Sequence, residues 1–236
     1  MGRAKEILVK VIPSKVANEF VKLNHYSGKV VPNSTLHFGC FLDDKMHGVM
    51  SYGPSINKKG TINLVEGTGW NEFIELNRMA FDEYLPKYSE SRCIAISIKL
   101  IKKNAPQIKW IISFADGTQC GDGTIYRASG FNLVGIAISG QVFNFNGEIV
   151  HGKILWDKSL VKGWTVSDDC MNKLRAKGHK IERLNGFQLK YIYFIDKTKI
   201  KDLSVPIMPF LKIDELSAGM YKGNKVTLAS RQAIEA

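Results

Sequence analysis

The apolar positions of the chain follow two periods, one of about two residues and one of about 3.6. A period of two is typical of half-buried strands, and the longer period is typical of amphipathic helices. Strands are predicted over residues 6–12, 36–42, 47–52, 72–81, 109–116, 131–138 and 189–195. Helices are predicted over residues 14–24, 91–103, 124–129 and 167–177. This interleaving predicts an α/β protein with a mixed, partly parallel central sheet flanked by helices.

Three local details of this pattern can be checked against a structure. Ser14 follows Pro13 and is expected to cap the first helix. The segment 53–70 is rich in Gly, Asn, Lys and Pro, which predicts a mobile loop. Within the strand 72–81, alternation places Phe73, Glu75, Asn77 and Met79 on one face and Ile74, Leu76, Arg78 and Ala80 on the other.

The composition is that of an ordinary globular protein, with 44% hydrophobic and 23% charged residues. The chain contains no run of eighteen apolar residues and no signal-peptide core near its start, so no membrane span is expected. Its four cysteines, Cys40, Cys93, Cys120 and Cys170, form no CxxC pair. A structural zinc site is therefore not expected, and we predict reduced thiols and a cytoplasmic location.

The chain carries a net charge of +11, from 33 Lys and Arg against 22 Asp and Glu. Residues 1–136 contribute +5 and residues 137–236 contribute +6, so the excess is not confined to a basic tail. A positive surface attracts polyanions such as nucleic acid, although it also serves solubility alone. We expect residues 1–138 to form the catalytic domain. Residues 139–236 are expected to be a C-terminal extension on the same domain that contacts DNA or forms a homodimer.

The turn before the predicted helix 91–103 is a candidate phosphate site. A helix N-terminus offers backbone N–H groups and a positive dipole end, which suit a pyrophosphate. Ser89, Ser91 and Arg92 can add hydroxyl and guanidinium contacts there. The alternative is that Ser91 only caps the helix and Arg92 only faces solvent.

Other chemistry-bearing residues lie near element ends. Asp116 ends an apolar strand and precedes a glycine-rich turn, where it could be a base, a metal ligand or a turn-capping side chain. His25 and Tyr26 follow the first helix, where His is a candidate metal ligand or base and Tyr a candidate acid or stacking platform. The alternative for His25 is an interaction with the helix dipole.

A basic group near the predicted helix 167–177 is a candidate for contacts with nucleic-acid phosphates. Its members are Lys173, Arg175, Lys177 and Lys180. The alternative is a solvated helix face.

Several segments resemble known protein families. Residues 125–131, Ile-Tyr-Arg-Ala-Ser-Gly-Phe, resemble the end of the last conserved helix of GNAT acetyltransferases. Four blocks in this order resemble the Mom family of phage DNA-modification proteins. They are His-Tyr-Ser-Gly at 25–28, Glu-Leu-Asn-Arg-Met-Ala at 75–80, Ser-Glu-Ser-Arg at 89–92, and Ser-Phe-Ala-Asp at 113–116 with Gly-Asp-Gly-Thr-Ile-Tyr-Arg at 121–127.

The resemblance implies a GNAT-like fold and an enzyme that converts adenine in double-stranded DNA to a carbamoylmethyl (acetamido) derivative at the exocyclic amine. Such a phage protein would act in the host cytoplasm and protect DNA from restriction. The resemblance also implies acetyl-CoA or a related acyl donor, and iron. It assigns Arg78, Ser91 and Tyr126 to the coenzyme or catalytic region, and His25, Tyr26 and Asp116 to the catalytic or iron region, with His25 and Asp116 as metal ligands.

One departure from the GNAT pattern concerns the coenzyme. Residues 85–92 contain no glycine, whereas GNAT enzymes cradle the CoA pyrophosphate with a glycine-containing loop. The backbone cannot approach a pyrophosphate as closely there, which favours a weaker or different coenzyme. Two other functions stay open: a conventional acetyltransferase acting on a small amine or protein, and a non-catalytic DNA-binding protein on a degenerate GNAT scaffold.

Overall fold

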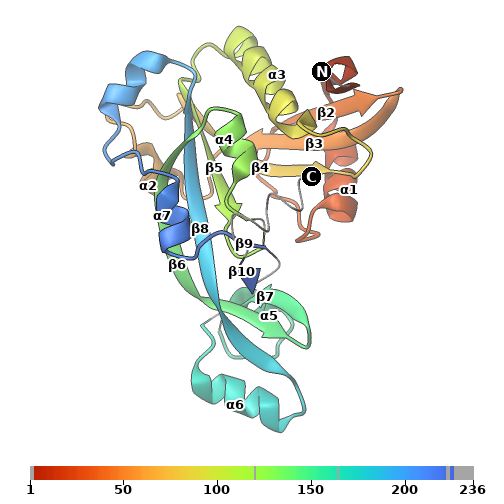
Figure 1. Ribbon diagram of the computed structural model, residues 1–236, viewed down its shortest axis with the longest axis vertical. Helices are drawn as coiled ribbons and strands as arrows, with labels where there is room; N and C mark the ends of the chain where they lie inside the picture. The colour runs from red at the N-terminus through yellow and green to blue at the C-terminus, as the bar shows by residue number, and fades with distance from the viewer. Residues whose placement is uncertain (1–2, 120, 164, 222–223, 226–236) are drawn as a thin grey trace. The chain divides into compact units, whose positions relative to one another are not determined.

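The computed structural model describes residues 3–119, 121–163, 165–221 and 224–225 (Figure 1). Cys120 lies outside the described residues. The elements follow in the order η1 (Arg3–Glu6), β1 (Leu8–Val11), α1 (Ser14–Asn24), β2 (Leu36–Leu42), β3 (Lys45–Gly53), α2 (Lys58–Ile62), β4 (Phe73–Phe81), α3 (Ser89–Asn104), β5 (Trp110–Asp116), α4 (Thr124–Ala128), β6 (Asn132–Phe145), β7 (Glu148–His151), α5 (Gly152–Asp157), α6 (Asp168–Ala176), β8 (Ile181–Phe194), η2 (Lys197–Asp202), α7 (Leu211–Glu215), β9 (Met220–Tyr221) and β10 (Asn224–Lys225).

Eight strands form an open sheet in the order β1-β2-β3-β4-β5-β8-β6-β7, and β9 pairs with β10. Strands β1 to β4 pair antiparallel, whereas β4 and β5 run parallel. Helices flank the sheet, so the predicted mixed α/β architecture is confirmed. Among the described residues, no helix is both long enough and apolar enough to cross a bilayer.

The chain divides into two compact units. The first comprises residues 1–114, 124–134 and 191–208, and the second comprises residues 115–123, 135–190 and 209–236. Strands β5, β6 and β8 contribute residues to both units. The division into domains at residue 138, expected from the sequence, stays a prediction.

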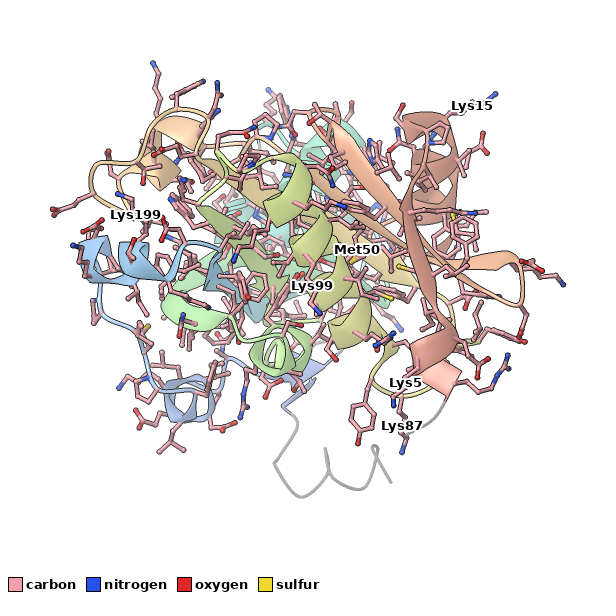
Figure 2. All side chains as sticks on the ribbon, turned by 90° about the horizontal axis from the view of Figure 1, so that it is seen from above. Lys5, Lys15, Met50, Lys87, Lys99 and Lys199 are labelled. Carbon is pink, nitrogen blue, oxygen red and sulfur yellow. The ribbon has the colours of Figure 1, made fainter. Side chains whose placement is uncertain are left out.

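In the first unit, α1 and α3 cover opposite faces of strands β2 to β4. The buried side of α1, with Ala17 and Val21, packs against Val49 and Ala80, which are directly paired on β3 and β4. The next pair along the strands, Met50 and Met79, therefore faces the other way, towards α3. Figure 2 shows Lys15 of α1 and Lys99 of α3 on opposite sides of the strands.

The start of α1 differs from the prediction. Pro13 rather than Ser14 occupies the N-cap position, and no side chain caps the helix there. Proline suits this position because its φ is already fixed near −62° and the first turn needs no donor from it. The expectation that Ser14 caps the helix was wrong.

The segment 53–70 contains a short helix that the sequence did not reveal. Helix α2 spans Lys58–Ile62, and the side chain of Asn57 accepts a hydrogen bond from the Gly60 N–H at 3.2 Å. Val65 beyond the helix is buried in a cluster with Phe73 and Trp110, whose rings stack at 4.3 Å. Apolar contacts thus anchor a segment whose composition predicted only a loop.

Helix α3 begins at Ser89, two residues earlier than predicted. Tyr88 takes a left-handed conformation with φ 70° and ends the preceding turn. The buried residues of the helix include Cys93, Ile94, Ile98 and Ile101. Lys102 and Lys103 lie in the last turn, where their positive charges interact favourably with the negative end of the helix dipole. The predicted spacing of the isoleucines is confirmed.

The second unit has an apolar core of its own. It combines Phe143 and Phe145 of β6, Leu155 of α5, and Met171 and Leu174 of α6. Strand β7 and helix α5 were not predicted, and β6 and β8 are longer than expected. The polar stretch Ser139-Gly140-Gln141 interrupts the apolar pattern of β6, but the guanidinium of Arg183 on β8 donates to the Gly140 carbonyl and supports the strand there.

Candidate active site

A bulge in β4 decides which way its polar residues point. The pairing with β3 shifts between Ser51 and Tyr52, so that Tyr52 pairs with Leu76 and Ser51 pairs with Arg78, leaving Asn77 as the extra residue. Leu76 and Arg78 therefore lie on opposite faces of the sheet. The expectation that strict alternation puts them on one face was wrong, because one inserted residue reverses the orientation of everything beyond it.

Arg78 lies on the α1 face, close to the loop that follows α1. Its Nε donates to the carbonyl of Lys29 at 3.0 Å, and one terminal nitrogen donates to the carbonyl of Asn77 at 2.9 Å. These bonds hold the guanidinium near His25, whose pKa it helps to lower. Two of the predicted site residues, Arg78 and His25, are thus brought together.

His25 is held as a neutral ring. Its Nδ1 accepts the Ser27 backbone N–H at 3.1 Å and lies 2.8 Å from the Ser27 hydroxyl. A backbone N–H can only donate, so the proton of the neutral imidazole is on Nε2. Burial first, and the Arg78 charge second, lower the pKa of His25 to about 4. In this state the ring offers a donor at Nε2, and its Nδ1 lone pair is engaged by Ser27.

Tyr26 packs on the neighbouring histidine, with ring centroids 4.3 Å apart, and is 54% exposed. An aromatic ring that is exposed to this extent can stack on a planar ligand. His25 and Tyr26 therefore present a fixed N–H donor and an accessible ring beside Arg78.

Tyr126 lies on the other face of the sheet, on α4. Its hydroxyl is 2.9 Å from the hydroxyl of Ser113 on β5, and its ring stacks on Tyr191 at 5.2 Å. Ser113 is fully buried. The sequence analysis did not select Ser113, although it is the single polar residue in the stretch 110–115 and this could have drawn attention to it.

The residues predicted to hold a phosphate already have partners at the start of α3. The Ser89 hydroxyl donates to the Pro86 carbonyl, Ser91 donates to the Tyr88 carbonyl, and Arg92 donates to the Lys5 carbonyl. Ser89 is fully buried, whereas Ser91 and Arg92 are half-buried. Figure 2 shows Lys5 and Lys87 at the same corner of the first unit, so basic side chains gather at this end of the helix.

Asp116 belongs to the second unit, where it organises the following turn. Its Oδ1 accepts the backbone N–H groups of Thr118 at 2.9 Å and Gln119 at 3.2 Å. This is the turn-capping arrangement that the sequence left open. The Asp116 carboxylate also raises the pKa of His151, against a larger lowering by burial.

An iron site requires several His, Cys, Asp or Glu side chains close together. The described residues contain no group of three or more His, Cys, Asp or Glu side chains that could hold a metal ion. The Nδ1 of His25 accepts a backbone N–H, and its Nε2 carries the ring proton. A metal at Nε2 would have to displace this proton, and no such group of ligands is present among the described residues, so the donors there do not form an iron site.

The predicted nucleic-acid group divides into two kinds of side chain. Lys173 pairs with Asp169 at 2.6 Å, and Arg175 donates to the Ile181 carbonyl and to Asn172. Arg175 thereby ties α6 to β8. Lys177 and Lys180 are exposed at the end of the helix.

These features define a mixed α/β protein with polar side chains gathered on both faces of a bulged central strand. Among solved structures, this chain is similar at low identity to acetyltransferases. One from Bacillus subtilis in complex with CoA is 10% identical, with a TM-score of 0.45 over 80% of this chain and 98% of its own. The spermidine/spermine N-acetyltransferase SpeG from Vibrio cholerae is 7% identical, with a TM-score of 0.48 over 85% of this chain and 99% of its own.

Sequence similarity assigns the family. The model of the Mom protein family matches residues 6–212. The methylcarbamoylase Mom of Escherichia phage Mu is 33% identical over 205 residues, which cover 86% of this chain and 82% of that protein. The chain therefore belongs to the Mom protein family, as the four motif blocks predicted.

Proposed function

We propose that this protein modifies DNA by placing a carbamoylmethyl group on the exocyclic amine of adenine. The observation that carries the proposal is the 33% identity, over most of both chains, to a protein named methylcarbamoylase. The net charge of +11 supports a polyanionic substrate. Such a modification would protect phage DNA from restriction in the cytoplasm of the host.

We place the reaction at β4, with Arg78, His25 and Tyr26 on one face of the sheet and Tyr126 on the other, where the pairing of β4 with β5 ends. His25 supplies a neutral N–H donor next to a fixed guanidinium, and both favour a substrate oxygen that gains negative charge. Tyr26 offers an accessible ring on which a base extruded from the duplex can stack. We also propose Asp116, which belongs to the second unit, as a catalytic group.

Acetyl-CoA or a related acyl donor is the proposed second substrate. Ser91, Arg92 and the neighbouring lysines at the start of α3 are the groups that would meet its phosphates. Ser89 is buried, so in this proposal it supports the turn and does not contact the phosphates. We assign no step of the reaction to iron. The experiment below measures modification with and without added iron.

The proposal is tested by expressing the protein with a plasmid, digesting the plasmid to nucleosides and measuring their masses, with and without added iron. We expect the carbamoylmethyl derivative of deoxyadenosine from the wild type. We expect none from His25→Ala or Asp116→Ala, with both variants folded as judged by circular dichroism. Full activity in both variants would contradict the site assignment.

The same experiment separates the two other functions. Unmodified adenine throughout, from soluble protein supplied with iron, contradicts the proposal. A conventional acetyltransferase would then consume acetyl-CoA in the absence of DNA. A non-catalytic DNA-binding protein would bind DNA with unchanged affinity after Asp116→Ala and leave no covalent product.

A further inference from the structure

The buried hydroxyl of Ser113 joins three elements of the first unit. Its Oγ lies 3.1 Å from the carbonyl oxygen of Leu76 on β4 and 2.9 Å from the hydroxyl oxygen of Tyr126 on α4. A carbonyl oxygen only accepts, and each hydroxyl has one proton to donate. The Ser113 hydroxyl has the donor geometry in both contacts, so its one proton is shared between the Leu76 carbonyl and the Tyr126 hydroxyl oxygen.

This short chain of hydrogen bonds lies where β4 and β5 stop pairing. The parallel register runs from Phe73 with Trp110 to Leu76 with Ser113, and the next residue of β4 is the bulged Asn77. Leu76 and Ser113 are thus the last paired residues before the strands separate. The Tyr126 hydroxyl is fixed at that point of separation.

Ring contacts fix the rest of the Tyr126 side chain. The ring stacks on Tyr191 at 5.2 Å and 25°, and meets the edge of Phe131 at 5.5 Å and 62°. These contacts set the plane of the ring but not the direction of its O–H bond, which rotates about the C–O bond. Because Ser113 donates to the phenol oxygen, the Tyr126 O–H bond has to point away from Ser113, where it can act as a donor.

We propose that Ser113 is a positioning residue that orients the Tyr126 hydroxyl for DNA modification. The inference rests on the proposed function, because it takes Tyr126 to act in that reaction. It predicts that replacing Ser113 slows the reaction only when the Tyr126 hydroxyl is present. A serine that only satisfies the Leu76 carbonyl would show no such dependence.

The protein offers a matched control in a second buried serine and tyrosine pair. The Tyr52 hydroxyl is 2.6 Å from the hydroxyl of Ser97, which donates to the Ile94 carbonyl at 2.8 Å. Both serines are fully buried, and each lies within hydrogen-bond distance of a backbone carbonyl and of a tyrosine hydroxyl. Neither Ser97 nor Tyr52 is assigned to the site, so Ser97→Ala reports the structural cost of losing such a pair.

The test compares Ser113→Ala, Tyr126→Phe, the double variant, Ser113→Thr and Ser97→Ala in the full chain. The rate at which modified adenine appears in a plasmid is measured at equal levels of soluble protein. Ser113→Ala should slow modification about tenfold, the scale of one missing hydrogen bond. In the Tyr126→Phe background it should have no further effect. Ser113→Thr keeps the hydroxyl and should restore most of the rate, and Ser97→Ala should match the wild type.

An NMR measurement on the protein without DNA tests the inference even where a variant folds poorly or has lost all activity. With tyrosine labelled by ¹³C at Cζ, the Tyr126 resonance is assigned as the one missing in Tyr126→Phe. It should shift in Ser113→Ala and stay in place in Ser97→Ala. An unshifted resonance overturns the inference.

The kinetic outcomes distinguish the two proposals. The inference is overturned if Ser113→Ala slows modification equally in both backgrounds, or if Ser113→Ala is fully active. In either case, modification by the wild type still upholds the proposed function. Unmodified adenine from the wild type overturns the proposed function, and with it the reaction that Ser113 would serve.

Discussion

His25 shows how one residue couples the site to pH. Burial, and secondly the charge of Arg78, lower its pKa to about 4, below the 6.5 of a free imidazole. The folded protein therefore binds fewer protons than the unfolded chain between pH 6.5 and 4. Stability falls as the pH is lowered through this window, and below pH 4 the contribution becomes constant.

We predict that His25→Gln removes part of this acid sensitivity. Urea unfolding of the wild type and the variant between pH 7 and 4 should show a smaller loss of unfolding free energy in the variant. His37 and His151, whose pKa values are also lowered by burial, are retained in both proteins and contribute to the remaining slope. Identical slopes would show that His25 titrates normally.

The charge of Arg78 leads to a second prediction, which concerns the pKa of His25. Arg78→Gln should raise the pKa of His25 while leaving it below 6.5, because burial is the larger cause. Histidine resonances followed by NMR through a pH titration measure this directly. Arg92→Gln is the control, since Arg92 contacts Lys5 and is not among the causes of the His25 shift. A titration midpoint that Arg78→Gln leaves unchanged would contradict the assigned cause.

At the scale of elements, a glycine at the end of β3, next to the bulge, lets a loop approach the strand closely. A Cβ at Gly53 would lie 2.4 Å from the Asn33 carbonyl oxygen and 2.8 Å from the Ser34 Cα, which are backbone atoms of the covering loop. The close approach of this loop therefore requires glycine.

We predict that Gly53→Ala destabilises the protein by about 1–3 kcal/mol, the usual cost of forcing an extra methyl group into a packed site. Gly135→Ala is the matched strand control, because its added Cβ would make only an ordinary contact with Lys190 at 3.6 Å. Denaturant unfolding measures both. Equal effects of the two substitutions would show that the loop moves at no cost.

At the scale of the molecule, the positive charge is spread over both halves of the sequence. In the second unit the charges serve different purposes, since Arg175 and Arg183 donate to backbone carbonyls. Lys177 and Lys180 are exposed at the end of α6. They are the members of the predicted group best suited to contact DNA phosphates.

We predict that Lys177→Ala with Lys180→Ala weakens DNA binding and reduces the slope of log affinity against log salt by about 0.9 for each DNA phosphate that the variant no longer neutralises. Lys212→Ala is the control from the same unit, because Lys212 pairs with Glu215 at 2.7 Å. Fluorescence anisotropy with a duplex at several salt concentrations measures both. An unchanged slope in the double variant would place the DNA elsewhere.

The sequence alone determined the alternation of strands and helices, the helix at 91–103 and the family. These rest on local periodicity and on contiguous motifs, which a linear chain displays directly. It also selected Arg78, His25 and Tyr126, through resemblance to the Mom family. The burial of the segment around α2 and the hydrogen bonds of Ser113 were not visible, because each depends on residues distant in sequence.

Only the tertiary structure decided which face each polar residue of β4 occupies. A bulge is a mismatch between two strands, so neither strand records it alone, and it turned Arg78 towards His25 and left Leu76 facing Ser113. Burial likewise decided that His25 is neutral and that Ser89 is enclosed. The candidate site residues follow from sequence, whereas their orientation and protonation follow from packing.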